Sequence, residues 1–194
     1  MKEPMSFDPK AYGPVFEELL EEEQLNPLGP GSPSAKVKSA LIALTVERAF
    51  VPHKIVDANM AKACLSATWL YHDYLDESHR ISQSIDTPTG SYWHGIMHRR
   101  EPDFSNSKGW FRKVGEHPVF KLLRTAAAEL ASASNVHESA AFLANQPNWE
   151  PFRFVDLCEA CIKGTSPSEM LCRQIQKREW QLLFDYSYHQ TIGH

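Results

Sequence analysis

Apolar residues recur every three or four positions along most of the chain, which is the spacing of amphipathic helices. In residues 15–25 (VFEELLEEEQL), for example, the apolar side chains share one side of a helix and the glutamates occupy the other. No segment shows the period-two alternation, flanked by hairpin turns, that is typical of antiparallel strands. The pattern therefore predicts an all-α fold, built as antiparallel helical hairpins with short connections in a compact single domain.

Prolines, glycines and capping residues divide this pattern into separate helices. Asp57 is a plausible N-cap, and Glu101-Pro102-Asp103 is a tight break between two short helices. Pro167 lies where the first turn of a helix tolerates proline. The helices are expected at about residues 15–25, 34–50, 57–71, 75–85, two between 90 and 117, 118–133, 135–144, 152–163 and 167–188.

A Pro/Gly-rich segment interrupts the helical pattern early in the chain. Residues 26–34 (NPLGPGSPS) contain three prolines and two glycines in nine positions, so they cannot continue a helix. We expect them to act as a linker. The chain is thus predicted to have an N-terminal arm and linker over residues 1–33, followed by an all-helical domain over residues 34–194.

The composition is that of an ordinary globular protein. The 194 residues carry a formal charge of −4 without a long Lys/Arg run, so no general attraction to nucleic acid or to a membrane surface is expected. There is no apolar run of about 18 residues and no apolar signal core at the start of the sequence. We therefore expect a cytoplasmic protein with a protein or small-molecule partner. Whether it forms a homo-oligomer is left open.

One helical hairpin resembles a known repeat. Residues 101–118 (EPDFSNSKGWFRKVGEHP) resemble the second helix and exit turn of a tetratricopeptide repeat, and the preceding hairpin repeats the pattern more weakly. The matching positions are Gly95, Phe104, Ser107, Phe111, Val114 and Pro118, with Leu75, Ser78 and Ile85 in the preceding hairpin. Leu75 and Phe104 are 29 positions apart, against a family period of about 34. The resemblance implies repeat-like packing and a surface for partners, but no catalytic residues.

Histidines and carboxylates gather in two neighbouring segments of the chain. On a helix, His94 and His98 share a face that Glu101 continues, and Asp76 and His79 converge in the preceding hairpin. If the hairpins stack side by side, the two sets face each other. Neutral imidazoles with carboxylates suit a divalent metal (zinc, iron or manganese), which could activate water for hydrolysis. The candidate metal ligands are His72, Asp76, His79, His94, His98 and Glu101.

The same histidines admit another interpretation. They could be core residues hydrogen-bonded to neighbouring carboxylates, which is the commoner fate of buried polar side chains. The metalloprotease motif HExxH is absent. The doublet His72-Asp73 resembles that of the HD-type metal phosphohydrolases, which are also all-helical, and a histidine–aspartate pair at a helix end is the alternative.

Basic and aromatic side chains also accumulate between residues 90 and 118. They could hold the phosphate or carboxylate group of a ligand, or they could pair with the surrounding acids. The candidate ligand-binding residues are Trp93, Arg99, Arg100 and Arg112. Elsewhere, Cys158 and Cys161 form a CxxC, which away from a βαβ pattern indicates buried structural thiols.

Two functions are compatible with these features. The first is a non-enzymatic ligand- or protein-binding scaffold module whose His/Arg/Trp-rich face spans residues 90–118. The alternative is a metal-dependent hydrolase, or another metal enzyme, that uses the histidine and carboxylate cluster. Nucleotide-binding and acyl-transfer motifs such as GxxxxGK[ST], GxGxxG and GxSxG are missing from the sequence.

Overall fold

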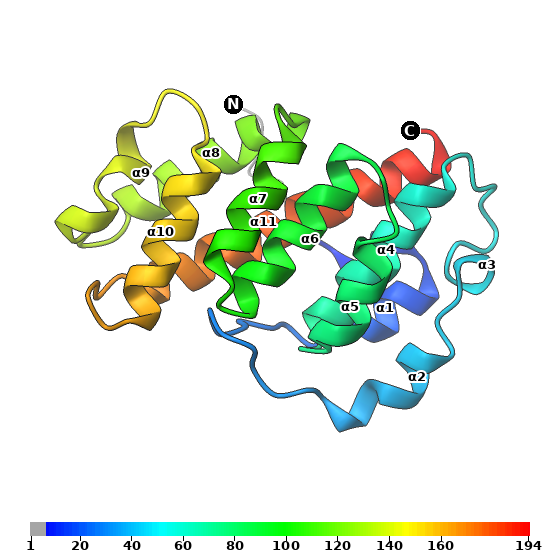
Figure 1. Ribbon diagram of the computed structural model, residues 1–194. Helices are drawn as coiled ribbons and strands as arrows, with labels where there is room; N and C mark the ends of the chain where they lie inside the picture. The colour runs from blue at the N-terminus through cyan, green and yellow to red at the C-terminus, as the bar shows by residue number, and fades with distance from the viewer. Residues whose placement is uncertain (1–6) are drawn as a thin grey trace.

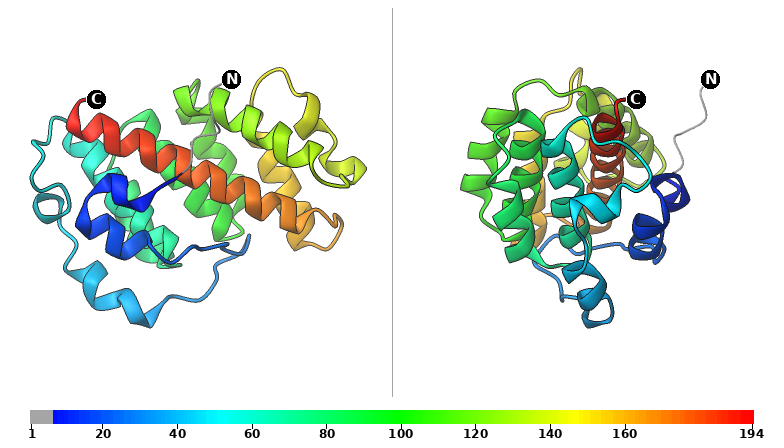
Figure 2. Two further views of the ribbon diagram at one scale, coloured as in Figure 1. Left: turned by 180° about the vertical axis from the view of Figure 1, so that it is seen from behind. Right: turned by 90° about the vertical axis from the view of Figure 1, so that its right-hand side faces the viewer.

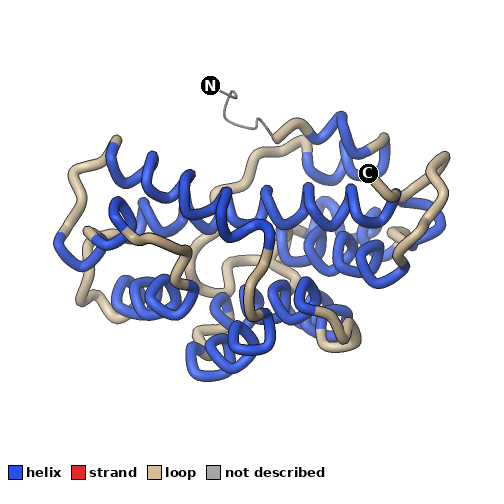
Figure 3. The backbone as a smooth tube through the Cα atoms, turned by 90° about the horizontal axis from the view of Figure 1, so that it is seen from above, coloured by secondary structure: helices blue, strands red, loops and turns tan. Residues whose placement is uncertain are grey.

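A computed structural model describes residues 7–194, and every regular element within that range is helical (Figures 1 and 3). The all-α prediction is thereby confirmed for the described residues. Short 3-10 turns at Pro9–Tyr12, Ala35–Val37 and Glu138–Ala140 accompany the α-helices. The α-helices are α1 Pro14–Leu20, α2 Lys38–Ile42, α3 Val46–Ala49, α4 Ala58–Tyr71, α5 Leu75–Ser82, α6 Pro88–Arg100, α7 Phe104–Val114, α8 Pro118–Ser132, α9 Phe142–Asn145, α10 Pro151–Ile162 and α11 Glu169–Ile192.

The C-terminal helix α11 is the longest element and runs the length of the molecule (Figure 2). It packs against α4 and α8 and, more briefly, against α10. Leu183 and Phe184 are fully buried, and Phe184 stacks on Trp180 with ring centroids 5.0 Å apart. The helix therefore joins the two ends of the molecule through one continuous apolar core.

Two helical hairpins, α4–α5 and α6–α7, lie beside this long helix and contact each other through α5 and α6. The close approach of α6 and α7 depends on Gly95, where a Cβ would lie 3.1 Å from the Phe111 ring. The hydroxyl of Ser107 donates a hydrogen bond of 2.7 Å to the Gly95 carbonyl. These contacts agree with the small residues noted in the sequence, while membership of the tetratricopeptide repeats stays a prediction.

Helix α6 is enclosed on every side, because each residue from Thr89 to Arg100 is buried. A helix of this kind must satisfy its charged side chains inside the protein. Arg99 is 1% exposed and forms an ion pair with Glu179 of α11, which is 0% exposed. Tyr92 donates a hydrogen bond of 3.0 Å to the same carboxylate, and the Arg99 guanidinium lies 4.8 Å from the Phe154 ring centroid. This group links α6, α10 and α11.

The neighbouring Arg100 holds the Pro/Gly-rich segment against the body of the protein. Its guanidinium contacts the Asp73 carboxylate at 2.6 Å and donates to the carbonyls of Gly29 and Pro30. Asp73 also accepts hydrogen bonds from the Asn26 amide and the Ser32 backbone N–H. The expected linker is therefore fixed to the C-terminal ends of α4 and α6.

The N-terminal arm, as far as the structure describes it, shares the core of the helical domain. Phe16 is fully buried and contacts the aromatic rings of Phe50, Phe184 and Tyr188. Tyr12 donates a hydrogen bond of 2.9 Å to Asp185 of α11. Residues 7–33 and 34–194 are thus packed together.

Several helix boundaries differ from those expected. The segment 34–50 is divided, since Thr45 caps a new helix by accepting a hydrogen bond from the Arg48 N–H. Helix α6 starts at Pro88, before the expected start at about residue 90, because Thr87 caps it. The segment 135–144 forms a 3-10 turn capped by His137 followed by α9. In each case a threonine or histidine side chain caps the first turn of a helix at a position that the spacing of apolar residues does not predict.

Replacing Glu179 with leucine should destabilise the protein by about 3–5 kcal/mol, because Arg99 would remain charged and buried without a partner. The double variant Arg99→Met/Glu179→Leu should lose less, since it removes both charges. Urea unfolding followed by circular dichroism measures both effects. As a control, Lys163→Met breaks the exposed Lys163–Glu159 pair and should cost at most about 1 kcal/mol. A double variant as unstable as Glu179→Leu would contradict this interpretation.

Gly31→Ala should destabilise the protein by about 1–2 kcal/mol, whereas Gly29→Ala should change its stability by less than about 0.5 kcal/mol. Gly31 has a φ of +78°, and a Cβ there would overlap the Asp73 carboxylate. At Gly29 a Cβ meets nothing within 4 Å. Equal unfolding midpoints in urea for the two variants would show that the Asp73 contact does not fix the segment.

Candidate metal centre

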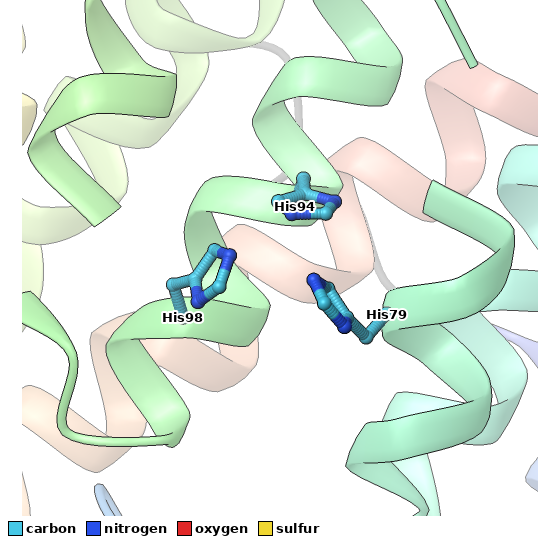
Figure 4. Close-up of side chains that lie close together, drawn as sticks. All are labelled: His79, His94 and His98. Atoms are coloured by element: carbon cyan, nitrogen blue, oxygen red, sulfur yellow. The ribbon is translucent and has the colours of Figure 1, made fainter. Parts of the chain in front are cut away.

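Three histidine side chains from two helices converge beside the α6–α7 hairpin. One ligand nitrogen from each of His79, His94 and His98 lies within 4.8 Å of the others. Figure 4 shows the rings directed toward one another, with His79 on α5 and the other two on α6. The ring centroids are 4.6 Å apart for His79–His94, 5.1 Å for His79–His98 and 4.7 Å for His94–His98.

The helical repeat and the packing of α5 on α6 account for this geometry. His94 and His98 are separated by one helical turn, so their side chains lie on the same face of α6. The contact between α5 and α6 brings His79, in the last turn of α5, opposite that face. His94 and His98 are 1% and 5% exposed, and His79 is half-buried, so solvent approaches the cluster at His79.

The hydrogen bonds of Ser82 favour one tautomer of His94. The Ser82 hydroxyl donates to the carbonyl of His79 at 3.2 Å, so its oxygen is free to accept from Nδ1–H of His94 at 3.0 Å. The lone pair of His94 then lies on Nε2, where it can bind a metal. The ring also packs against Trp110 with centroids 4.1 Å apart, which restricts its orientation.

His98 has a carboxylate on one side and an amide on the other. Glu101 Oε2 lies 3.1 Å from His98 Nδ1, away from the ideal direction of an N–H···O bond, so the buried nitrogen has no regular hydrogen-bond partner. Asn106 Nδ2 lies 3.1 Å from Nε2 and acts as the donor. This arrangement places the proton on Nδ1 next to Glu101. Asn106 is exposed, so its amide can turn away when another group approaches Nε2.

Burial favours the neutral form of two of these imidazoles, those of His94 and His98. It lowers the pKa of His94 to about 3, with further contributions from His98, His79 and Lys113. Burial also lowers the pKa of His98, partly offset by the nearby carboxylate of Glu101. Neutral imidazole is the form that binds metals, so the site needs little proton release before it coordinates an ion.

The structure separates the other candidate ligands from this cluster. The His72 ring contacts the Leu19 carbonyl at 2.7 Å, and Asp73 of the His-Asp doublet is held by Arg100. Asp76 is exposed on the first turn of α5. Of the six predicted ligands, three histidines therefore meet and Glu101 adjoins them.

The candidate ligand-binding side chains are mostly enclosed. Trp93 is 0% exposed and donates a hydrogen bond of 3.2 Å to Ser187, while Arg99 and Arg100 are engaged in their buried ion pairs. Arg112 is exposed, with its guanidinium 5.7 Å from the Phe152 ring centroid. These four side chains do not share one open surface.

Ser82, Asn106 and Trp110 contact the cluster but are not among the residues predicted for the metal site. Ser82 lies one turn after His79 on α5. This spacing is the sequence signal that places Ser82 on the same helix face as His79. The positions of Asn106 and Trp110 depend on how α7 packs against α6, which the spacing of residues does not reveal. The predicted burial of Cys158 and Cys161 is confirmed, and Cys64 and Cys172 are buried thiols as well.

Comparison with family models finds no match for this chain, and comparisons with curated proteins and with solved structures find none either.

Among residues 7–194, none of the helices has both the length and the apolar character needed to cross a membrane.

The buried histidines should make the protein sensitive to mild acid. The folded-state pKa of His94, about 3, lies below the ordinary value of 6.5, so the unfolded chain takes up a proton first as the pH falls. The contribution of neutral, buried His94 to the free energy of unfolding is therefore complete above about pH 6.5 and is lost as the pH falls toward 3. Burial lowers the pKa of His117 to about 4, which adds a similar loss.

The free energy of unfolding, measured in urea at pH 7 and pH 4.5, tests this dependence. His94→Gln should lose less stability between the two pH values than the unsubstituted protein does, because its side chain does not titrate. His189→Gln, at an exposed position of α11, serves as the control and should keep the full loss. An unchanged loss in His94→Gln would refute the assignment.

Proposed function

We propose that this protein binds a divalent transition metal ion, Zn²⁺ in the first place, through His79, His94 and His98, and that the metal centre serves hydrolytic chemistry. The observation that carries the proposal is the convergence of three imidazole nitrogens within 4.8 Å. Imidazole is a preferred ligand of zinc and of the neighbouring transition metals, with Zn–N distances near 2.0–2.1 Å. Three nitrogens around one ion at that distance lie roughly 3.5 Å apart, so small side-chain rotations complete the site.

The groups around the histidines support metal binding. A ligating histidine commonly donates its second N–H to a carboxylate or another oxygen, which orients the ring and raises its basicity. Glu101 stands in this position for His98, and Ser82 does so for His94. Glu101 also supplies a negative charge near an ion held by three neutral ligands, which reduces the cost of placing that ion in a partly buried site.

A three-histidine set suits a reactive metal more than a structural one. Structural zinc sites have four protein ligands, whereas catalytic sites usually have three and leave the fourth position to water. The bound metal would lower the pKa of that water to about 7, producing a nucleophile near neutral pH. The half-buried position of His79 gives water and a substrate a route to the open coordination position.

Untagged protein should bind about one equivalent of Zn²⁺ in isothermal titration calorimetry. At a free metal concentration of about 100 times the dissociation constant, the folded state gains about 2.7 kcal/mol. For a chain of this length, that gain raises Tm by about 5–10 °C. Differential scanning calorimetry with and without Zn²⁺ measures the shift.

Two histidine variants distinguish this site from adventitious binding. His79→Gln removes the half-buried ligand with little disturbance of the core, and it should abolish most of the Tm shift. His189→Gln removes an exposed histidine elsewhere and should keep the shift. A protein that binds no Zn²⁺, Co²⁺ or Ni²⁺, or a shift that His79→Gln leaves intact, would exclude the proposed centre.

A further inference from the structure

A cleft separate from the three-histidine cluster lies where α7 ends and α8 and α10 begin. The cleft has a volume of about 970 Å³. In Figure 1, α8 and α10 lie on the left and α2 and α3 on the right, with α7 near the middle of the molecule. This volume is in the range of small-molecule binding sites.

Positive charge predominates along the walls of the cleft. Four basic side chains line it against two acidic ones, Glu116 and Glu150. Only one of the basic residues, Arg153, forms an ion pair within the described chain, with Glu150 at 3.2 Å. The basic side chains are Arg112, Lys121, Arg124 and Arg153.

Two helix N-termini open onto the same cleft. Helix α8 begins at Pro118 and α10 at Pro151, and both residues line the cleft. The first N–H groups of a helix lack intrahelical acceptors and carry partial positive charge, which favours an anion. No side chain caps α10, because the Glu150 carboxylate makes no capping hydrogen bond.

One residue that lines the cleft carries a buried, unpaired donor. Trp149 lines the cleft and is 5% exposed, and its indole N–H has no hydrogen-bond acceptor within residues 7–194. An unpaired buried donor is costly, so native proteins rarely keep one without a reason.

We propose that this cleft binds a small molecule through its phosphate or carboxylate group, independently of the metal centre. Lys121, Arg124 and the start of α10 hold the anion, since they supply charge-assisted donors around one space. Phe152, which is 38% exposed, and Phe120 give an apolar wall for the rest of the molecule. The volume suits a metabolite-sized ligand, and an acidic peptide is the competing occupant.

Isothermal titration calorimetry with phenyl phosphate and with benzoate, at low ionic strength, tests the proposal. At least one of the two should bind with a dissociation constant of about 1 mM or below. The double variant Lys121→Gln/Arg124→Gln should weaken that binding at least about tenfold, because two charge-assisted donors are lost. Lys121→Gln alone, at an exposed position, should weaken it measurably and covers the case in which the double variant does not fold.

The matched control is Lys36→Gln/Lys62→Gln, which removes the same charge from exposed positions outside the cleft and should leave the affinity within about twofold. Binding of only one probe supports the proposal and identifies the anionic group. The proposal is overturned if neither probe binds at about 10 mM, or if the control weakens binding as much as the cleft variants. It is also overturned if only a triglutamate peptide binds.

Discussion

The fold depends on placing the charged end of α6 inside the protein. Arg99 and Arg100 are both buried there, and each can remain charged only because a carboxylate from a distant part of the chain reaches it. Glu179 brings α11 against α6, and Asp73 brings the end of α4 and the Pro/Gly-rich segment against it. The cost of an unpaired buried charge is several kcal/mol, so these two ion pairs fix how the hairpins, the long helix and the N-terminal segment are arranged.

The enclosure of α6 also determines the chemistry of its histidines. His94 and His98 lie on the face of α6 that meets α5 and α7, and burial makes their protonation unfavourable. The same packing supplies the groups that orient them, since Ser82 comes from α5 and Asn106 and Trp110 come from α7. A neutral, oriented pair of imidazoles next to a third, more accessible one is the arrangement on which the proposed metal centre rests.

Helix α7 connects this centre with the anion cleft. It contacts the histidines through Asn106 and Trp110, and it contributes Phe111 and Arg112 to the cleft. Gly95 and Ser107 hold α7 closely against α6, so the helix has a fixed position relative to both regions. Two regions of different chemistry, one rich in imidazole and one rich in positive charge, thus share one short helix.

The sequence by itself determined the all-α class, because apolar residues recur with the helical period and prolines and glycines separate the segments. It also determined that His94 and His98 share a face, since that relation depends only on the spacing within one helix. Only the tertiary structure decided that His79 joins them while His72 and Asp76 do not, and that Arg99 and Arg100 are buried ion-pair partners. Those outcomes depend on which helix faces pack together, and contacts such as Arg99–Glu179, 80 positions apart, leave no local pattern in the sequence.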